Sequence, residues 1–235
     1  MQVLSLRDIP CWATLYAMQH DAIHRIIKLL RSECRQWATP SVTVIAEQLH
    51  SPYTVLIACI ISLRTKDAVT AEASARLFQR ASTPQVMLTL SEEEIASLIY
   101  PAGFYRTKAR QIREMSGALM ERFGGRVPDH LDQLLSLKGV GRKTANLVVT
   151  LGYGKPGICV DIHVHRIMNR WGYVATKTPE QTEAALRARL PQEYWIEIND
   201  LLVSYGQNRC VPISPYCSLC ALYAWCDQVG VERRR

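Results

Sequence analysis

Two groups of residues in this 235-residue chain have side chains and spacing that could carry chemistry. The first is a run of four cysteines near the C-terminus, spaced Cys-x6-Cys-x2-Cys-x5-Cys: Cys210, Cys217, Cys220 and Cys226. Thiolates clustered in this way either bind a metal centre or form disulfides. The leading stretch Met1–Met18 does not read as a signal peptide, so we expect a cytoplasmic chain with reduced thiols, which disfavours disulfides.

The second group centres on Lys143, within Leu137-Lys138-Gly139-Val140-Gly141-Arg142-Lys143-Thr144. The two glycines predict a tight turn between helices, and amides at the start of the second helix can hydrogen-bond a phosphate. A nucleotide-binding loop is excluded, because it needs a glycine directly before the lysine and a preceding strand. An uncharged lysine amine is a nucleophile that can form a Schiff base with a sugar aldehyde carbon. The alternative is an ordinary surface cation.

A carboxylate follows in Val160-Asp161-Ile162-His163-Val164-His165. Asp161 comes after an apolar stretch and begins a predicted helix. It can therefore be a helix N-cap, or a buried carboxylate that activates a nucleophile or stabilises a cationic transition state, and the two roles are compatible. No other His, Asp or Cys is spaced to join His163 and His165 in a metal site, which favours structural or phosphate contacts for them.

Helical periodicity runs through the chain and predicts an all-α protein. We expect helices at 21–37, 53–63, 67–80, 107–123, 131–137, 142–151, 161–170, 178–190 and 195–206, with further helix starts at Thr83-Pro84 and at Ser91–Glu94. Asp67 is expected to cap the helix at 67–80. The glycine-rich segment 152–157 predicts a domain boundary near residue 155, with the N-terminal helix packing against the C-terminal part.

Composition favours a polyanionic partner. The chain has 28 Lys and Arg against 21 Asp and Glu, and its pI is about 9.1. No apolar run is long enough to span a membrane. Cys11, Cys34, Cys59 and Cys159 have no ligand spacing, so we interpret them as buried small apolar residues. The terminal Glu232–Arg235 is interpreted as a solvated tail.

The hairpin Leu137–Asn146, the segment Val160–Val164 and the four cysteines, in that order, resemble the endonuclease III family of DNA glycosylases within the helix-hairpin-helix superfamily. The resemblance covers about Ser51 to Cys226. It implies a six-helix domain at 45–155 and a cluster domain formed by 1–44 and 156–235, with DNA bound in the cleft between them. It also implies that the four cysteines ligate a [4Fe–4S] cluster, while four-cysteine zinc stays open as the alternative.

The resemblance further implies a monomeric, bifunctional DNA glycosylase and abasic-site lyase of base excision repair in a bacterial or archaeal cytoplasm. Its partner would be double-stranded DNA that contains oxidised pyrimidines or abasic sites, with no membrane association. The damaged nucleotide is flipped out of the stack. Lys143 then attacks the anomeric carbon with help from Asp161, and β-elimination from the resulting imine cuts the strand.

The same resemblance implies the DNA contacts. Backbone amides of the hairpin would bind a phosphate, and two wedge residues would fill the gap left by the flipped base. The implied DNA-binding residues are Arg64, Phe104, Lys138, Gly139, Val140, Gly141, Arg142, Thr144 and His163. Three positions depart from the family pattern: Arg64 stands where Gln is frequent, Lys138 where Pro is frequent and Ile162 where Thr is frequent. Core packing is the alternative for Phe104.

Three other functions fit parts of the same pattern. A mismatch-specific glycosylase would share the fold. A non-catalytic DNA-binding protein with a redox-sensing cluster would share the cysteines, but Lys143 and Asp161 argue against it. A zinc-dependent DNA-binding module is the third.

Overall fold

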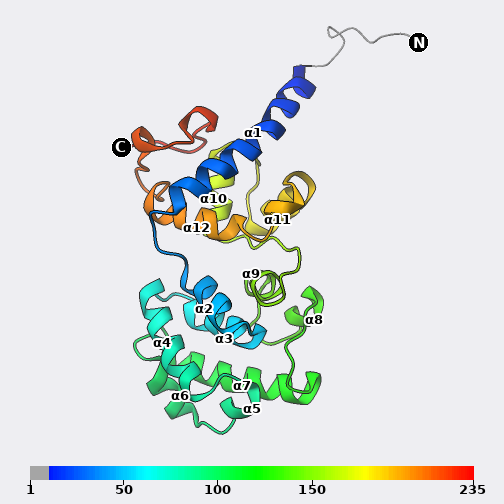
Figure 1. The fold of residues 1–235 in the computed structure, drawn as a ribbon, viewed down its shortest axis with the longest axis vertical. Helices are drawn as coiled ribbons and strands as arrows, with labels where there is room; N and C mark the ends of the chain where they lie inside the picture. The colour runs from blue at the N-terminus through cyan, green and yellow to red at the C-terminus, as the bar shows by residue number, and fades with distance from the viewer. Residues whose placement is uncertain (1–10) are drawn as a thin grey trace, which may run out of the picture. The chain divides into compact units, whose positions relative to one another are not determined.

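The computed structural model describes residues 11–235, with side chains from residue 22 onwards (Figure 1). Within that range the backbone forms twelve α-helices, a few short 3-10 and π turns and no β-strand, which confirms the all-α prediction. The predictions for Met1–Met18 and for the side chain of Cys11 fall outside the described side chains. No helix of the described part is long and apolar enough to cross a membrane.

Two compact units divide the described chain. The hairpin unit comprises Thr39–Asp161 and Trp195–Asp200, and it contains both Lys143 and Asp161. The cysteine unit comprises the described residues up to Ala38, Ile162–Tyr194 and Leu201–Arg235. The domain limits 45–155 and 156–235 expected from the sequence stay a prediction.

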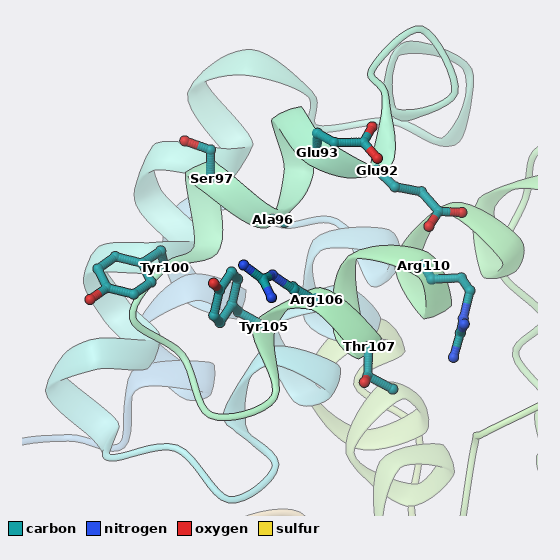
Figure 2. Close-up of a pocket in the computed structure, with 9 residues that line it drawn as sticks. All are labelled: Glu92, Glu93, Ala96, Ser97, Tyr100, Tyr105, Arg106, Thr107 and Arg110. Atoms are coloured by element: carbon teal, nitrogen blue, oxygen red, sulfur yellow. The ribbon is translucent and has the colours of Figure 1, made fainter.

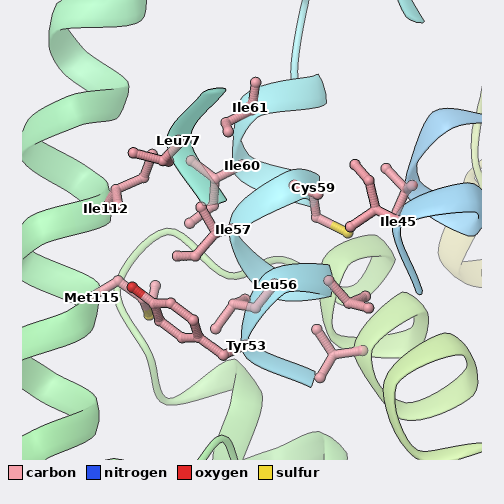
Figure 3. Packing of buried hydrophobic residues seen from close by; sticks show 14 of the residues in the cluster. Ile45, Tyr53, Leu56, Ile57, Cys59, Ile60, Ile61, Leu77, Ile112 and Met115 are labelled. Atoms are coloured by element: carbon pink, nitrogen blue, oxygen red, sulfur yellow. The ribbon is translucent and has the colours of Figure 1, made fainter. Parts of the chain in front are cut away.

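The hairpin unit is built around α3 (Pro52–Ser62), whose sequence is apolar on every side. Such a helix is stable only where neighbours cover it all round, and every residue from Tyr53 to Ile61 is buried. Figure 3 shows α3 between Ile112 and Met115 of α7 (Tyr105–Phe123) on one side and Ile45 of α2 (Ser41–Leu49) on the other. The remaining helices of the unit are α4 (Asp67–Arg80), α5 (Pro84–Met87), α6 (Glu92–Ile99), α8 (Leu131–Leu135) and α9 (Arg142–Leu147).

Local capping explains where several of these helices begin and end. The predicted capping box is present, since Ser91 and Glu94 exchange hydrogen bonds at the start of α6, and Gly124 ends α7 in the left-handed region. The predicted cap by Asp67 is wrong, because the N-cap of α4 is Lys66. The Asp67 carboxylate instead accepts from the Ser41 amide at 3.0 Å and the Ser41 hydroxyl at 2.7 Å, at the start of α2.

The helix predicted at 142–151 is not regular. Its α-helical part ends at Leu147, and Val148–Gly152 continues as a π-helical turn. The Thr150 hydroxyl donates to the Asn146 carbonyl at 2.9 Å and so competes with the backbone for that acceptor. The turn lies against α3.

The cysteine unit contains α1 (Cys11–Cys34), α10 (Ile162–Arg170), α11 (Pro179–Arg189) and most of α12 (Ile198–Asn208). As expected, the N-terminal helix packs against the C-terminal part of the chain. The Cys34 thiol donates to the Leu201 carbonyl at 3.4 Å, and Arg209 lies 3.3 Å from Glu33. Figure 1 shows α1 beside α12 within this unit.

Candidate active site

The turn between α8 and α9 has the geometry expected of a glycine hairpin. Gly139 has a φ of +83°, and a Cβ atom at this position would lie 2.2 Å from Nε2 of the Gln111 side chain. The Gln111 amide donates to the Gly139 carbonyl at 3.4 Å, and the Val140 side chain is buried in the core. The Val140 amide donates to the Leu137 carbonyl at 3.1 Å, so it is engaged inside the turn.

Lys143 lies in the first turn of α9, close to Asp161. Its Nζ is 3.8 Å from Oδ2 of Asp161. The Lys143 side chain is 45% exposed, whereas that of Asp161 is 7% exposed. The amine can therefore meet a large ligand from outside, while the carboxylate acts from behind it.

Two hydrogen bonds, both made by Cys159, connect the backbone near Lys143 with the backbone that leads to Asp161. The Cys159 thiol donates to the Lys143 carbonyl at 3.7 Å, and the Asn199 amide donates to the Cys159 carbonyl at 3.2 Å. Burial raises the pKa of the Cys159 thiol well above its usual value, so the sulfur keeps the proton that it donates. The segment that leads to Asp161 is thus fixed against α9.

Asp200 adds a second carboxylate to this region. It accepts a hydrogen bond from the Thr43 hydroxyl at 2.8 Å. Burial raises its pKa to about 6, and the nearby carboxylates of Glu47 and Asp161 add to that rise. Sequence reasoning missed both Asn199 and Asp200, because they belong to no motif and lie 38 and 39 residues beyond Asp161 in the chain.

An exposed amine with a carboxylate behind it can perform nucleophilic chemistry. The amine attacks an electrophilic carbon, and the carboxylate accepts a proton or stabilises positive charge. The separation of 3.8 Å is longer than a hydrogen bond, and such distances commonly shorten when substrate binds.

Two of the predicted DNA-binding residues lie together on adjacent loops of the same unit. The Arg64 guanidinium is 5.4 Å from the centre of the Phe104 ring. The Phe104 side chain is 62% exposed, which contradicts the core-packing alternative. Both residues have positive φ, +53° for Arg64 and +58° for Phe104, in the left-handed region that non-glycine residues rarely adopt.

The other predicted DNA-binding residues have different surroundings. Lys138 lies 3.0 Å from the carboxylate of Glu114, so its charge is already paired on the surface. Arg142 is exposed, and Thr144 is buried. His163 lies in the cysteine unit, where its Nδ1 is 3.1 Å from the Arg166 guanidinium.

The four C-terminal cysteines lie on the loop after α12, which contains two short 3-10 turns. Burial raises the pKa of Cys226 to about 11, and the charges of Cys210, Cys220 and Cys217 add to that rise. The buried Arg170 donates to the Cys210 sulfur at 3.4 Å, and the Tyr205 hydroxyl lies 3.1 Å from the Cys220 sulfur. In the described part of the chain, no group of three or more His, Cys, Asp or Glu is arranged to hold a metal ion.

The open pocket between α6 and α7, of about 650 Å³, is not at this site. Figure 2 shows Glu92 and Glu93 on one wall, Arg106 and Arg110 on the other, and Tyr100 beside Tyr105 at one end. Neither Lys143 nor Asp161 lines it.

Lys108 is a further residue that sequence reasoning missed. It lies on the buried face of α7 together with Ile112 and Met115, and its side chain is buried. The sequence did indicate this burial. Lys108 lies four residues before Ile112 and seven before Met115, so the helical period places all three on the same apolar face.

Comparison with known proteins places this geometry in context. A sequence profile of the HhH-GPD superfamily base excision DNA repair proteins matches residues 57–192. The chain is 48% identical to endonuclease III of Thermotoga maritima over 75% of its length and 83% of that protein. It is 36% identical to endonuclease III of Bacillus subtilis over 80% of its length and 90% of that protein.

A solved structure gives the same result for the fold. The chain resembles a trapped covalent intermediate of endonuclease III with DNA, with a TM-score of 0.71 and 35% identity. The similarity covers 76% of this chain and 84% of that one.

Proposed function

Because this chain belongs to the endonuclease III family of base excision DNA repair proteins, we propose that Lys143 is its nucleophile and Asp161 the supporting carboxylate. The protein is a bifunctional DNA glycosylase and abasic-site lyase that acts on oxidised pyrimidines. The observation that carries the residue assignment is the 3.8 Å separation of Lys143 Nζ and Asp161 Oδ2, at the end of a glycine hairpin.

The reaction begins when the unprotonated amine of Lys143 attacks C1′ of the deoxyribose. The C1′–N bond to the damaged base breaks, and the base leaves with the bonding electrons and takes up a proton. Asp161 stabilises the positive charge that develops on the sugar and accepts the proton that the attacking nitrogen loses. Its low exposure favours this role, because a buried carboxylate acts through a low dielectric.

The strand is cut in the second stage. The C1′–O4′ bond opens to give a protonated imine between Lys143 and C1′. Loss of a proton from C2′ then expels the 3′ phosphate with the C3′–O3′ electron pair. Water hydrolyses the imine, which frees Lys143 and leaves an unsaturated aldehyde on one strand end and a phosphate on the other.

Duplex DNA with damaged bases or abasic sites is the proposed partner, bound by a monomer. The amides of Gly139 and Gly141 would bind a backbone phosphate, a contact that positions the strand without reading its sequence. Arg64 and Phe104 would fill the gap in the stack, since both are exposed and stand side by side. Lys138 is 88% exposed, and its ammonium has donors beyond the one that contacts Glu114, so it would add a cation beside that phosphate.

A [4Fe–4S] cluster is the proposed cofactor of Cys210, Cys217, Cys220 and Cys226. Four thiolates can bind either tetrahedral zinc or a [4Fe–4S] cluster, and membership of the endonuclease III family favours the cluster. The Arg170 guanidinium and the Tyr205 hydroxyl beside the sulfurs can donate hydrogen bonds to anionic, metal-bound sulfur. When bound, the cluster would fix the shape of the cysteine loop.

Borohydride trapping with abasic-site duplex DNA tests the residue assignment. We expect wild type to form a covalent adduct that peptide mapping locates at Lys143, and Lys143→Gln to form none. Asp161→Asn should slow trapping by about 100-fold or more while DNA binding persists, as expected for loss of a group that supports the transition state. An adduct at another side chain, or equal loss of binding and trapping in Asp161→Asn, would contradict the assignment.

A further inference from the structure

Lys108 contributes a buried ammonium group at the C-terminal end of α3. Its side chain is buried, and its Nζ donates to the Ile61 carbonyl at 2.6 Å, the Leu63 carbonyl at 2.5 Å and the Thr65 hydroxyl at 2.8 Å. An ammonium group has three donors, and all three are used here. Lysine is rarely buried unless its charge is satisfied, so this position has a specific task.

The end of α3 is a suitable place for a cation. The last carbonyls of a helix have no intrahelical partner, and the helix dipole makes this end negative. Burial lowers the pKa of Lys108 from 10.5 to about 8, so the group is still mostly charged at neutral pH. The charge therefore holds the chain as it leaves α3 and enters the loop that carries Arg64.

Thr65 connects this loop to a second one. Its hydroxyl accepts from Lys108 and also from the backbone amide of Gly103 at 3.1 Å. Gly103 lies so close to the first loop that a Cβ atom there would be 2.5 Å from the Arg64 carbonyl oxygen. Two segments far apart in sequence, 63–66 and 100–104, are thus joined through the Thr65 side chain and a close approach of their backbones; we call them the wedge loops.

Each wedge loop presents one exposed residue in a strained conformation. Arg64 and Phe104 both have positive φ, and the guanidinium stands over the ring at 5.4 Å. A non-glycine residue in the left-handed region costs backbone free energy and persists only where its surroundings fix it. The hydrogen bonds from Lys108 and Thr65 connect the two loops directly beside these residues.

We propose that Lys108 and Thr65 are positioning residues, which lock the two wedge loops into one rigid unit that enters the base stack as the damaged nucleotide leaves it. The proposal rests on the proposed function, because it assigns a task to the residues that support the wedge. Rigid presentation matters because a side chain that is already ordered loses little conformational entropy on insertion. Two independent loops would each have to be ordered at that step.

A matched pair of variants tests the lock at Thr65. Valine keeps the side-chain volume and removes the hydroxyl, whereas serine keeps the hydroxyl. We expect Thr65→Val to slow single-turnover excision of an oxidised pyrimidine from duplex DNA by about tenfold, the effect of losing a hydrogen bond to a charged group, while Thr65→Ser stays near wild type. 2-Aminopurine placed next to the lesion, which brightens when unstacked, should report the same loss at the extrusion step.

A double-mutant cycle with Phe104→Ala separates positioning from general stability. If Thr65 acts through the wedge, Thr65→Val should add no further loss once Phe104 has been removed. Additive losses in the cycle, or unchanged extrusion in Thr65→Val, would overturn the lock. Lys108→Met should reproduce the Thr65→Val defect, and the exposed Lys177→Met, which removes the same charge elsewhere, should not.

Failure of the lock can be told apart from failure of the proposed function. Borohydride trapping of the wild-type protein on abasic DNA tests only whether Lys143 is the nucleophile. Absence of that adduct would refute the proposed function, whereas normal trapping together with unchanged extrusion in Thr65→Val would refute the lock alone.

Discussion

Replacement of Asp200 by asparagine should stabilise the protein, although it removes a residue from the neighbourhood of Lys143 and Asp161, the proposed catalytic pair. Burial raises the pKa of this carboxyl from 3.8 to about 6, so the folded protein holds an unfavourable charge at neutral pH. A difference of about 2 pKa units corresponds to about 3 kcal/mol. Asparagine has no charge and can still accept the Thr43 hydrogen bond, so up to about 3 kcal/mol of unfolding free energy should be gained at pH 7.5.

The gain in unfolding free energy should depend on pH. Its direction follows from the pKa of Asp200, which is 3.8 in the unfolded chain and about 6 in the folded protein. Below pH 3.8 both folded and unfolded carboxyls are protonated, and Asp200 has no effect. Between pH 3.8 and 6 the folded protein holds more protons than the unfolded chain, so wild-type stability falls as pH rises. Above pH 6 the Asp200 carboxyl is charged in both the folded and the unfolded state, so the full destabilisation of about 3 kcal/mol is present. The gain from Asp200→Asn should therefore be about 1.4 kcal/mol smaller at pH 5.0 than at pH 7.5.

Guanidinium unfolding of wild type and variant at these two pH values measures both quantities. The exposed Asp132→Asn, in the same unit, is the matched control and should give no comparable gain at either pH. Destabilisation by Asp200→Asn at pH 7.5, or a gain that is equal at the two pH values, would refute the reasoning that burial sets the charge state of Asp200.

Two further predictions concern the wedge loops and the cysteines. Gly103→Ala should lower the free energy of unfolding by about 1–3 kcal/mol, because its Cβ would meet the Arg64 carbonyl, whereas Gly117→Ala, with open space around it, should be neutral or stabilising; equal denaturant midpoints for the two would contradict the close approach. Cys226→Ala should remove the visible absorbance of an iron–sulfur cluster, while Cys34→Ala keeps it, and a colourless wild type that holds one zinc ion would exclude the cluster.

The sequence predicted the elements whose stability is local. The helix α4 ends at Arg80 as predicted, and the Ser91–Glu94 capping box forms as predicted, because these features depend on residues within a few positions of each other. The order of hairpin, Asp161 and cysteines likewise identified the family. The separation between Lys143 and Asp161 could be expected only from that resemblance.

The helix α2 was not predicted, and its stability is not local. Ser41–Leu49 contains Val42, Thr43, Val44 and Ile45 in succession, a β-branched run that has low helix propensity. Its start is instead capped from a distance by the Asp67 carboxylate, and its apolar face packs on α3. Asp200 and Lys108 were missed for a related reason, since burial and partners far along the chain define their roles.

The short segment 195–200 shows that the hairpin unit is not a continuous piece of chain. A fragment that ends at Asp161 would hold both members of the proposed catalytic pair, but not the Asn199 side-chain amide that donates to the Cys159 carbonyl. Separate expression of the two units therefore requires circular permutation or co-expression of segment 195–200. A simple truncation would keep Lys143 and Asp161 but lose the hydrogen bond that holds the backbone before Asp161.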